Sequence, residues 1–199
     1  MSTETQTGAV ITIATQQLQA FQKLLDAIDV ETLDRIVKRL TMARENGNLI
    51  YLAGNGGSAA IASHWVNDLG KATKRRGQQH MRVLSLCDNM AWLTALANDE
   101  GYETVFAGQL DNHAQAGDVL IVISSSGNSL NLVRAVELAK TRGVVTIGFV
   151  GFNGGVLKDM VDEHVLISTE KGAYGLVEPA HDLICHILTA CLSVRAEEV

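Results

Sequence analysis

The stretch of residues 48–68, NLIYLAGNGGSAAIASHWVND, decides the fold that we expect for this chain. The apolar run at 49–53 predicts a buried strand, and the glycine-rich turn at 54–58 predicts a close passage into a helix that starts at about Ala59. The first turn of such a helix offers unpaired N–H groups and a partial positive charge to an anion. The glycine spacing fits neither the dinucleotide-binding fingerprint nor the P-loop. Because many such turns bind nothing, the stretch alone leaves both a phosphate site and a purely structural turn open.

Two titratable side chains follow on the same expected helix. His64 and Asp68 are four residues apart, so they share one face of that helix. A candidate anion site and a candidate acid–base pair therefore lie within one short stretch of sequence.

Composition and charge limit the class of protein. The chain has 199 residues, of which 47% are hydrophobic and 19% charged, which is enough for one α/β domain with a proper core. The net charge of −6 argues against a nucleic-acid-binding surface, and we expect the short basic cluster at 71–76 to be a solvated loop.

The three cysteines, the N-terminus and the hydropathy indicate a compartment. The chain has three cysteines, an odd number, and they form no C-x-x-C motif; they are Cys87, Cys185 and Cys191. This pattern is typical of buried thiols in a reducing cytosol. The N-terminus lacks the pattern of a signal peptide, and no apolar run is long enough to span a membrane. We therefore expect a cytoplasmic protein.

Strand and helix patterns alternate along the chain after two amphipathic helices. This alternation predicts a single α/β domain, a five-stranded parallel doubly wound sheet flanked by helices. Residues 1–47 would be a helical appendage to the core at 48–199, packed on the sheet or forming a subunit interface, and their long apolar stripes favour the interface. The expected segments are helices at about 10–28 and 30–46, strands at 48–53, 81–86, 118–123, 144–150 and 164–168, helices at 89–97 and 102–113, and a final helix at about 178–194.

A second polar turn, SSSGNS at 124–129, follows the third expected strand. Its four hydroxyls surround the start of a helix, where hydroxyl and N–H groups can donate to phosphate. A helix cap needs only one such side chain, so the number of hydroxyls favours ligand binding over capping. Both polar turns are expected at the carboxyl edge of the sheet, where parallel sheets bind ligands.

Three motifs together resemble the sugar isomerase (SIS) family. They are G-N-G-G-S after the first strand, S-x-S-G-N-S after the third, and N-D-x-G-Y between them. Within the family the chain resembles the phosphoheptose isomerases, and the resemblance covers nearly the whole chain. It implies an aldose–ketose isomerase that converts sedoheptulose 7-phosphate to D-glycero-D-manno-heptose 7-phosphate. It also implies a homotetramer with sites at subunit contacts.

The resemblance further implies roles for individual residues. Zinc ligands would be His64, Asp68, Glu178 and His186, where zinc-binding relatives have His, Glu, Gln and His. Asp68 and Glu178 thus depart from the family pattern, as does Gly175, where the family has an acidic residue. The residues expected to contact the sugar phosphate are Asn55, Gly56, Gly57, Ser58, Asp99, Ser124, Ser125, Ser126, Ser129 and Glu178.

The expected chemistry is proton transfer through an enediol. Asp68 would act as the base and His186 as its acid partner, with zinc polarising the sugar oxygens. We expect His181, five residues from His186 and so on another helix face, to be structural. For Glu178, helix capping and metal binding both remain open.

Two other functions remain open at this point. The family includes a bacterial protein that associates with the replication initiator DnaA and lacks the full acid–base and metal set, so the chain could be a binding protein. It could also isomerise a different ketose phosphate. The presence of four ligand-capable side chains favours an enzyme.

Overall fold

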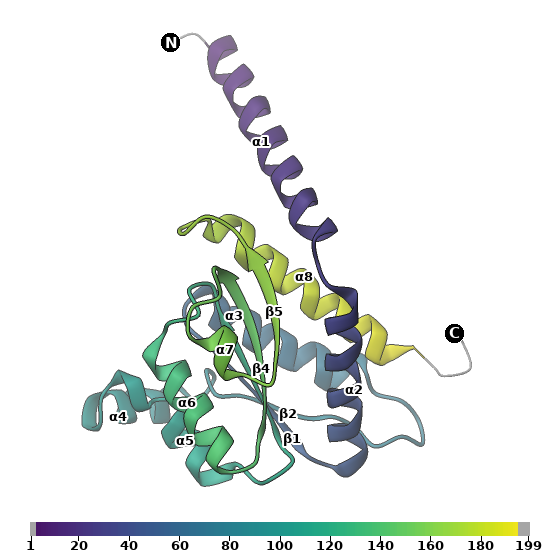
Figure 1. Cartoon of the computed structure of the whole chain (residues 1–199), viewed down its shortest axis with the longest axis vertical. Coiled ribbons are helices and arrows are strands. Elements are labelled where there is room, and N and C mark those ends of the chain that lie inside the picture. Colours follow the sequence, from purple (N-terminus) through teal and green to yellow (C-terminus); the bar gives the residue numbers. More distant parts are fainter. Residues whose placement is uncertain (1–2, 195–199) are drawn as a thin grey trace.

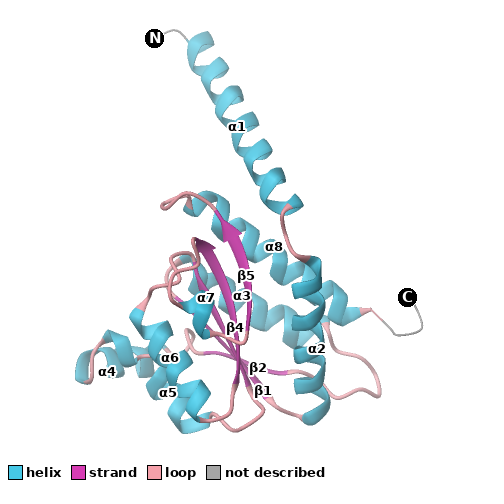
Figure 2. Ribbon diagram, in the orientation of Figure 1, coloured by secondary structure: helices cyan, strands magenta, loops and turns pink. Residues whose placement is uncertain are grey.

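A computed structural model describes residues 3–194 of the chain, with side chains from residue 8 onwards. Five parallel strands form one sheet in the order β2-β1-β3-β4-β5, with helices on both faces (Figures 1 and 2). The expected α/β fold with a five-stranded, doubly wound parallel sheet is confirmed.

The strands pair in parallel along the sheet. The strand β1 (Leu49–Gly54) lies between β2 (Arg82–Ser85) and β3 (Val119–Ser124). The sheet continues through β4 (Val145–Phe152) to β5 (Glu163–Ser168) at the edge. The direction of winding reverses between β1 and β3, because β2 lies on one side of β1 and all later strands lie on the other. The loops that follow β1 and β3 therefore diverge at this point and leave a crevice at the carboxyl edge.

One face of the sheet is covered by α2 (Val30–Asn46), α3 (Gly57–Asn67) and α8 (Tyr174–Ser193). Alternate residues of each strand point to this face, such as Ile50 and Leu52 of β1, which have no exposed surface. The helix α2 is thus part of the main core, as its buried residues show.

The other face is covered by α5 (Ala107–His113), α6 (Leu130–Thr141) and α7 (Leu157–Met160). Tyr51 and Ala53 of β1 point into this second core. Because both faces are buried, β1 and β3 are apolar along nearly their whole length, as the sequence predicts for parallel strands.

Three helices differ from the expected boundaries. The first, α1 (Thr3–Asp26), starts seven residues before the expected start at about Val10. The segment expected as one helix at 102–113 consists of a 3₁₀ turn, Tyr102–Thr104, followed by α5. The helix α4 (Met90–Asp99) precedes this turn. The final helix starts at Tyr174, four residues before the expected start. Pro179 consequently lies in the second turn of α8, where it removes one helical N–H donor.

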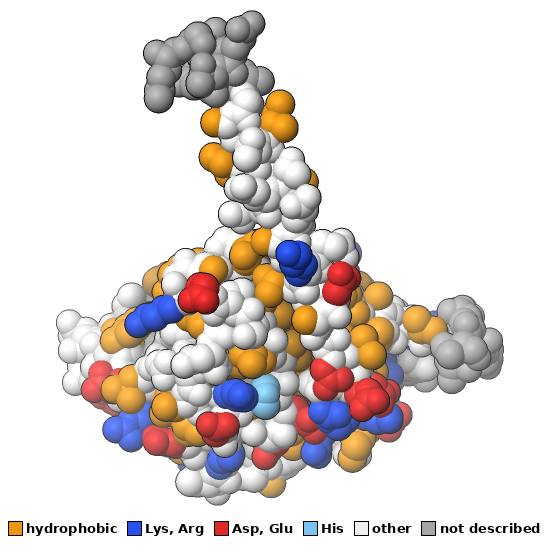
Figure 3. All heavy atoms as spheres, turned by 45° about the horizontal axis from the view of Figure 1, so that its top comes forward, with side chains coloured by type: hydrophobic (Ala, Val, Ile, Leu, Met, Phe, Trp, Pro, Cys, Tyr) orange, Lys and Arg blue, Asp and Glu red, His pale blue; other side chains and the backbone are white. Residues whose placement is uncertain are grey.

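The first helix, α1 (Thr3–Asp26), projects from the body of the molecule (Figure 1). Large apolar side chains are exposed along it, as the space-filling view shows (Figure 3); they are Val10, Ile11, Ile13 and Leu18. Of the two N-terminal helices, therefore, α2 packs on the core while α1 leaves an apolar surface uncovered. Among the described residues, no helix combines the length and apolarity that a membrane span requires.

His181 of α8 lies in the core beneath the sheet. The residue has no exposed surface, and its ring centroid lies 6.1 Å from that of Phe149. Neither ring nitrogen has a hydrogen-bond partner among the described residues. Burial disfavours the charged imidazolium and lowers the pKa of His181 to about 4, from an ordinary value of 6.5. This placement agrees with a structural histidine.

The depressed pKa of His181 predicts a loss of stability in acid. Between pH 6.5 and about 4 the unfolded chain binds a proton at His181 and the folded chain does not, so acid favours unfolding. We expect this effect to lower the free energy of unfolding by roughly 3 kcal/mol over that range. Urea titrations at pH 7 and pH 4 should show a smaller loss for His181→Leu than for the parent chain. Equal losses in the two proteins would contradict the assignment.

Candidate functional site

The loops after β1 and β3 are joined by a pair of amides at the switch point of the sheet. Asn55 Nδ2 donates to Asn131 Oδ1 at 3.0 Å, and Asn131 Nδ2 donates to Asn55 Oδ1 at 2.9 Å. Tyr102 also donates its hydroxyl proton to Asn55 Oδ1, at 2.9 Å. These three residues fix the orientation of the first loop relative to α6.

A cavity of about 140 Å³ opens between the two loops. It contains hydroxyl, amide and carboxylate groups and lies over the N-terminus of α6. Its lining residues are Asn55, Ser58, Ile123, Ser124, Ser125, Ser126, Ser129, Tyr174 and Glu178.

The serine hydroxyls of the second loop divide into two groups. Ser124 Oγ accepts a hydrogen bond from the Gly127 N–H at 3.1 Å, and Ser126 Oγ accepts one from the Asn128 N–H at 3.2 Å, so these two shape the loop. Ser125 is only 6% exposed, and its Oγ has no hydrogen-bond partner among the described residues. Ser129 is the N-cap residue of α6, but its side chain makes no capping bond in the described part of the chain. Helix capping therefore does not account for the four hydroxyls, whereas an anion in the cavity would satisfy them.

Glu178 lies beside the first turn of α3. A Cβ atom added to Gly57 would stand 2.5 Å from Glu178 Oε2, so this carboxylate packs directly on the glycine and would have to shift for any larger residue. Because α8 starts at Tyr174, Glu178 is outside the first turn of its own helix, so the capping alternative that the sequence left open is wrong. Its carboxylate instead faces the N-terminus of α3 and the cavity.

The helices α3 and α8 lie side by side and are joined through Trp65. This side chain is 1% exposed, and its Nε1–H donates to Thr189 Oγ1 at 3.0 Å. Its ring also packs on Phe149 of the sheet, with 5.3 Å between centroids. The bond and the packing set the distance between the two helices and the faces that they present to each other.

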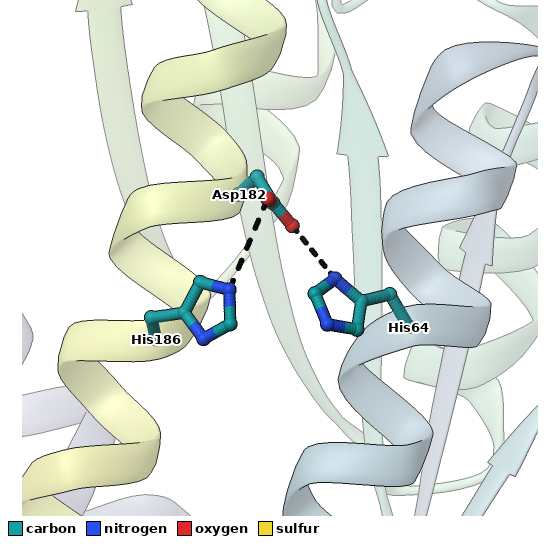
Figure 4. Close-up of side chains that lie close together, drawn as sticks. All are labelled: His64, Asp182 and His186. Atoms are coloured by element: carbon teal, nitrogen blue, oxygen red, sulfur yellow. Dashed lines mark hydrogen bonds and ion pairs between the residues drawn. The ribbon is translucent and has the colours of Figure 1, made fainter.

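Two histidines and two aspartates meet where α3 and α8 face each other. His64 Nδ1 lies 3.1 Å from Asp182 Oδ1, and His186 Nδ1 lies 3.2 Å from Asp68 Oδ2. The other two neighbouring pairs are longer, 3.8 Å for His64 Nε2 to Asp68 Oδ2 and 3.9 Å for His186 Nε2 to Asp182 Oδ2. Each imidazole thus lies between two carboxylates; Figure 4 shows His64, Asp182 and His186 pointing toward one another. We call these four residues the His–Asp cluster.

Asp68 lies where α3 changes its winding. It begins a π-helical turn, Asp68–Ala72, in which Leu69 is fully buried. Such wide turns inside helices are frequently found at functional sites. Here the turn holds Leu69 in the core directly after a carboxylate that faces α8.

The cavity over α6 continues toward the His–Asp cluster. A second, more open cavity has Tyr174 and Glu178 in common with the first and reaches His64 and Asp182. The Tyr174 ring is held by an edge-on contact with Phe152, with 5.2 Å between centroids. Phe152 has a φ of 52°, an uncommon conformation for an aromatic residue that tends to occur near functional sites. We call the loop at 124–129 the serine loop. A single elongated molecule could therefore contact the serine loop and the His–Asp cluster together.

The structure brings most of the expected site residues together, with two differences. Asp99 lies exposed at the end of α4, where it accepts a hydrogen bond from Asn98, and it lines neither of these two cavities. Asp182 is not among the expected residues although it lies inside the His–Asp cluster. The signal is present in the sequence, because Glu178, Asp182 and His186 follow one another at four-residue spacing on one helix face.

Sequence and structure are both similar to those of known proteins. Residues 15–151 match the SIS domain family. The phosphoheptose isomerase of a Nitratiruptor species is 42% identical over 151 residues, which are 75% of this chain and 79% of that protein. The solved phosphoheptose isomerases of Neisseria gonorrhoeae and Francisella tularensis have TM-scores of 0.82 and 0.84 and are 29% and 25% identical. The similarity covers 94% and 97% of this chain, and 97% and 99% of those chains.

The serine loop is held tightly against the loop after β4. Gly127 has a φ of 63°, and a Cβ atom placed on it would overlap the carbonyl group of Gly154. The Gly127 carbonyl accepts a hydrogen bond from the Leu157 N–H at 3.0 Å, and Asn128 Oδ1 accepts one from the Val156 N–H at 3.1 Å. The two loops therefore form one packed unit.

This packing predicts a large cost for Gly127→Ala. Both the left-handed conformation and the clash with backbone atoms oppose the new methyl group, so we expect the free energy of unfolding to fall by on the order of 3 kcal/mol or more. Gly172→Ala is the matched control, because Gly172 also has a positive φ, 96°, but has open space around it. We expect it to cost about 1–2 kcal/mol. Urea unfolding of both variants measures the difference, and similar costs would refute the clash.

Proposed function

Because the chain belongs to the SIS domain family and is a phosphosugar isomerase, we propose that it converts sedoheptulose 7-phosphate to D-glycero-D-manno-heptose 7-phosphate, with zinc bound near the reacting carbons. The reaction is an aldose–ketose isomerisation. It moves a hydrogen between two adjacent carbons and needs no redox cofactor.

The observation that carries this proposal is the Ser125 hydroxyl, which has no hydrogen-bond partner among the described residues. A buried hydroxyl without a hydrogen bond is costly, and this one lines a cavity at the N-terminus of a twelve-residue helix. A phosphate dianion would satisfy it and would also interact favourably with the helix dipole. We assign the phosphate to this serine loop, with Ser124, Ser126 and Ser129 around it. On the side of the first loop we assign the sugar to Asn55, Gly56, Gly57, Ser58 and Glu178, and Asp99 remains an assignment by resemblance.

The His–Asp cluster supplies the proton-transfer groups. We assign Asp68 as the base that removes a proton from the carbon beside the carbonyl, leaving an enediol. His186 Nδ1 lies 3.2 Å from Asp68 Oδ2, so the two can share a proton, and His186 is assigned as the acid that protonates the oxygen. Anchoring the phosphate in the serine loop holds the reacting carbons near this pair and so lowers the entropic part of the barrier.

The cluster also has the donor set of a zinc site. Imidazole nitrogens and carboxylate oxygens are ligands that zinc accepts, and His64, Asp182 and His186 each offer one such atom within 4.8 Å of the others. The resemblance implies His64, Asp68, Glu178 and His186 as the ligands. When bound, zinc would polarise the sugar oxygens and stabilise the enediol.

The assembly and the compartment are further parts of the proposal. We propose a homotetramer with sites at subunit contacts, which the exposed apolar residues of α1 support and which analytical ultracentrifugation can measure. We also propose a cytoplasmic location and no nucleic-acid partner, in keeping with the net charge of −6.

A second candidate substrate is a different ketose phosphate. Gly175 lines the second cavity, and an added Cβ there would meet nothing within 4 Å, so this wall of the site is open. A sugar that differs from sedoheptulose at the far end from its phosphate could occupy this space. By contrast, the DnaA-associating relative lacks the full acid–base and metal set, whereas this chain brings two histidines and two aspartates together in the His–Asp cluster. This disfavours a binding protein of that kind.

The direct test is turnover of sedoheptulose 7-phosphate by the purified chain, with zinc and after chelation. We expect zinc-dependent activity, a loss of at least about a hundredfold in kcat for Asp68→Asn, and a similar loss for His186→Ala. A panel of ketose phosphates assayed in parallel identifies the preferred sugar. Absence of turnover on sedoheptulose 7-phosphate, with turnover of another sugar in the panel, would replace the proposed substrate by the second candidate.

The phosphate assignment has a separate test. We expect Ser125→Ala to weaken binding of inorganic phosphate by about tenfold and to raise KM for the sugar phosphate by a similar factor, since one hydrogen bond to a charged group is lost. Ser193→Ala, at the far end of α8, is the control and should change neither value. Isothermal titration calorimetry measures the first quantity. Unchanged phosphate binding in Ser125→Ala would move the phosphate away from this loop.

A further inference from the structure

Asp182 occupies a central place in the His–Asp cluster that the resemblance to the family does not assign. Its Oδ1 lies 3.1 Å from His64 Nδ1, and its Oδ2 lies 3.9 Å from His186 Nε2 (Figure 4). One carboxylate thus faces both imidazoles, and it does so from the side that borders the second cavity.

Glu178 lies one helical turn away from this position. Its carboxylate packs against Gly57 at the start of α3 and lines the cavity of the serine loop. Among the described residues, His64, Asp182 and His186 form a group that could hold a metal ion, with one ligand atom from each lying within 4.8 Å of the others. Glu178, the other acidic residue on this face of α8, does not belong to the group. Asp182 is therefore level with the imidazoles, and Glu178 is level with the phosphate cavity.

Asp68 approaches the imidazoles through their other nitrogens. Asp182 faces His64 Nδ1 and His186 Nε2, whereas Asp68 faces His64 Nε2 at 3.8 Å and His186 Nδ1 at 3.2 Å. A metal-binding imidazole commonly donates its second N–H to a carboxylate, which fixes the ring and raises the basicity of the ligating nitrogen. The two aspartates are thus arranged for two different roles, one on the metal side and one behind the rings.

We propose that Asp182 is a zinc ligand together with His64 Nδ1 and His186 Nε2, in place of Glu178, and that Asp68 supports both imidazoles from outside the coordination sphere. The inference rests on the zinc in the proposed function. Neighbouring ligand atoms in a tetrahedral zinc site are about 3.3 Å apart. Asp182 Oδ1 lies 3.1 Å from His64 Nδ1, close to this value, and one ligand atom from each of the three residues lies within 4.8 Å of the others.

This arrangement separates two tasks that would otherwise fall on the same side chain. Asp68 keeps its oxygens free of the metal and can accept a hydrogen bond from the His186 Nδ1–H, because Asp182 provides the carboxylate on the metal side. Glu178, whose carboxylate lies beside the start of α3, is left free to contact the sugar phosphate. Three protein ligands also leave a coordination position open for substrate oxygens, as in catalytic zinc sites.

The test compares zinc affinity in Asp182→Ala and Glu178→Ala, measured by competition with a chromophoric chelator. Both changes remove the carboxylate and leave no side-chain ligand atom, whereas a glutamine at position 178 could still bind zinc as it does in relatives. We expect Asp182→Ala to weaken zinc binding by at least about a hundredfold and Glu178→Ala to change it by less than about threefold. The reverse order, or a parent chain that binds no zinc, would overturn the inference.

A spectroscopic measurement shows coordination independently of stability. In the Co²⁺-loaded Asp182→Cys variant, a thiolate ligand should add a sulfur-to-metal charge-transfer band that is absent from the Co²⁺-loaded parent chain. If the variant binds Co²⁺ without this band, Asp182 does not coordinate.

The isomerase assay keeps this inference separate from the proposed function. A parent chain that turns over the sugar phosphate but binds no zinc would refute the zinc ligand and leave the isomerase. Zinc held through Asp182, without turnover of sedoheptulose 7-phosphate, would support the ligand and refute the substrate.

Discussion

The lateral packing of α3 on α8 is the interaction on which the rest of the site depends. Trp65 provides it, since the buried indole packs on Phe149 and donates to Thr189 on the facing helix. The histidines and aspartates of the cluster come from these two helices and from the π-helical turn that continues α3, and the two imidazoles are only about half-buried. Their separations of 3–4 Å therefore follow from a contact made in the core beneath them. A change in how the two helices cross would move every pair in the cluster at once.

The order of the strands in the sheet creates the other part of the site, the crevice between the loops after β1 and β3. Because the winding reverses between β1 and β3, the two polar loops diverge and leave the crevice that the serine hydroxyls line. The helix α3 starts at this crevice and carries His64 and Asp68 away from it, while α8 faces it with Glu178, Asp182 and His186. The cavity lined by the serine hydroxyls and the His–Asp cluster thus follow one another along the pair α3 and α8.

The sequence predicts the sheet well because a parallel strand buried on both faces is apolar throughout, as at β1 and β3. The two loops are also visible in the sequence, since glycine and serine cluster there directly after apolar runs. The roles of Asp182 and Glu178 do not follow from local patterns, because they depend on how far along α8 each residue lies relative to α3. That relation is set by the packing of Trp65 and by the start of α8 at Tyr174. The sequence shows that α1 has an apolar stripe, but it does not show that this helix projects from the body and leaves the stripe exposed.

The packed unit formed by the serine loop and the loop after β4 has a kinetic consequence. Gly127 and Gly154 are in close backbone contact, and two hydrogen bonds join the loops at the start of α7. A loop held in this way has few alternative conformations, so a ligand finds its hydrogen-bond donors already oriented. If phosphate binds here as proposed, we expect association without a slow step of loop closure, and we expect differences in affinity among ligands to arise mainly from their dissociation rates.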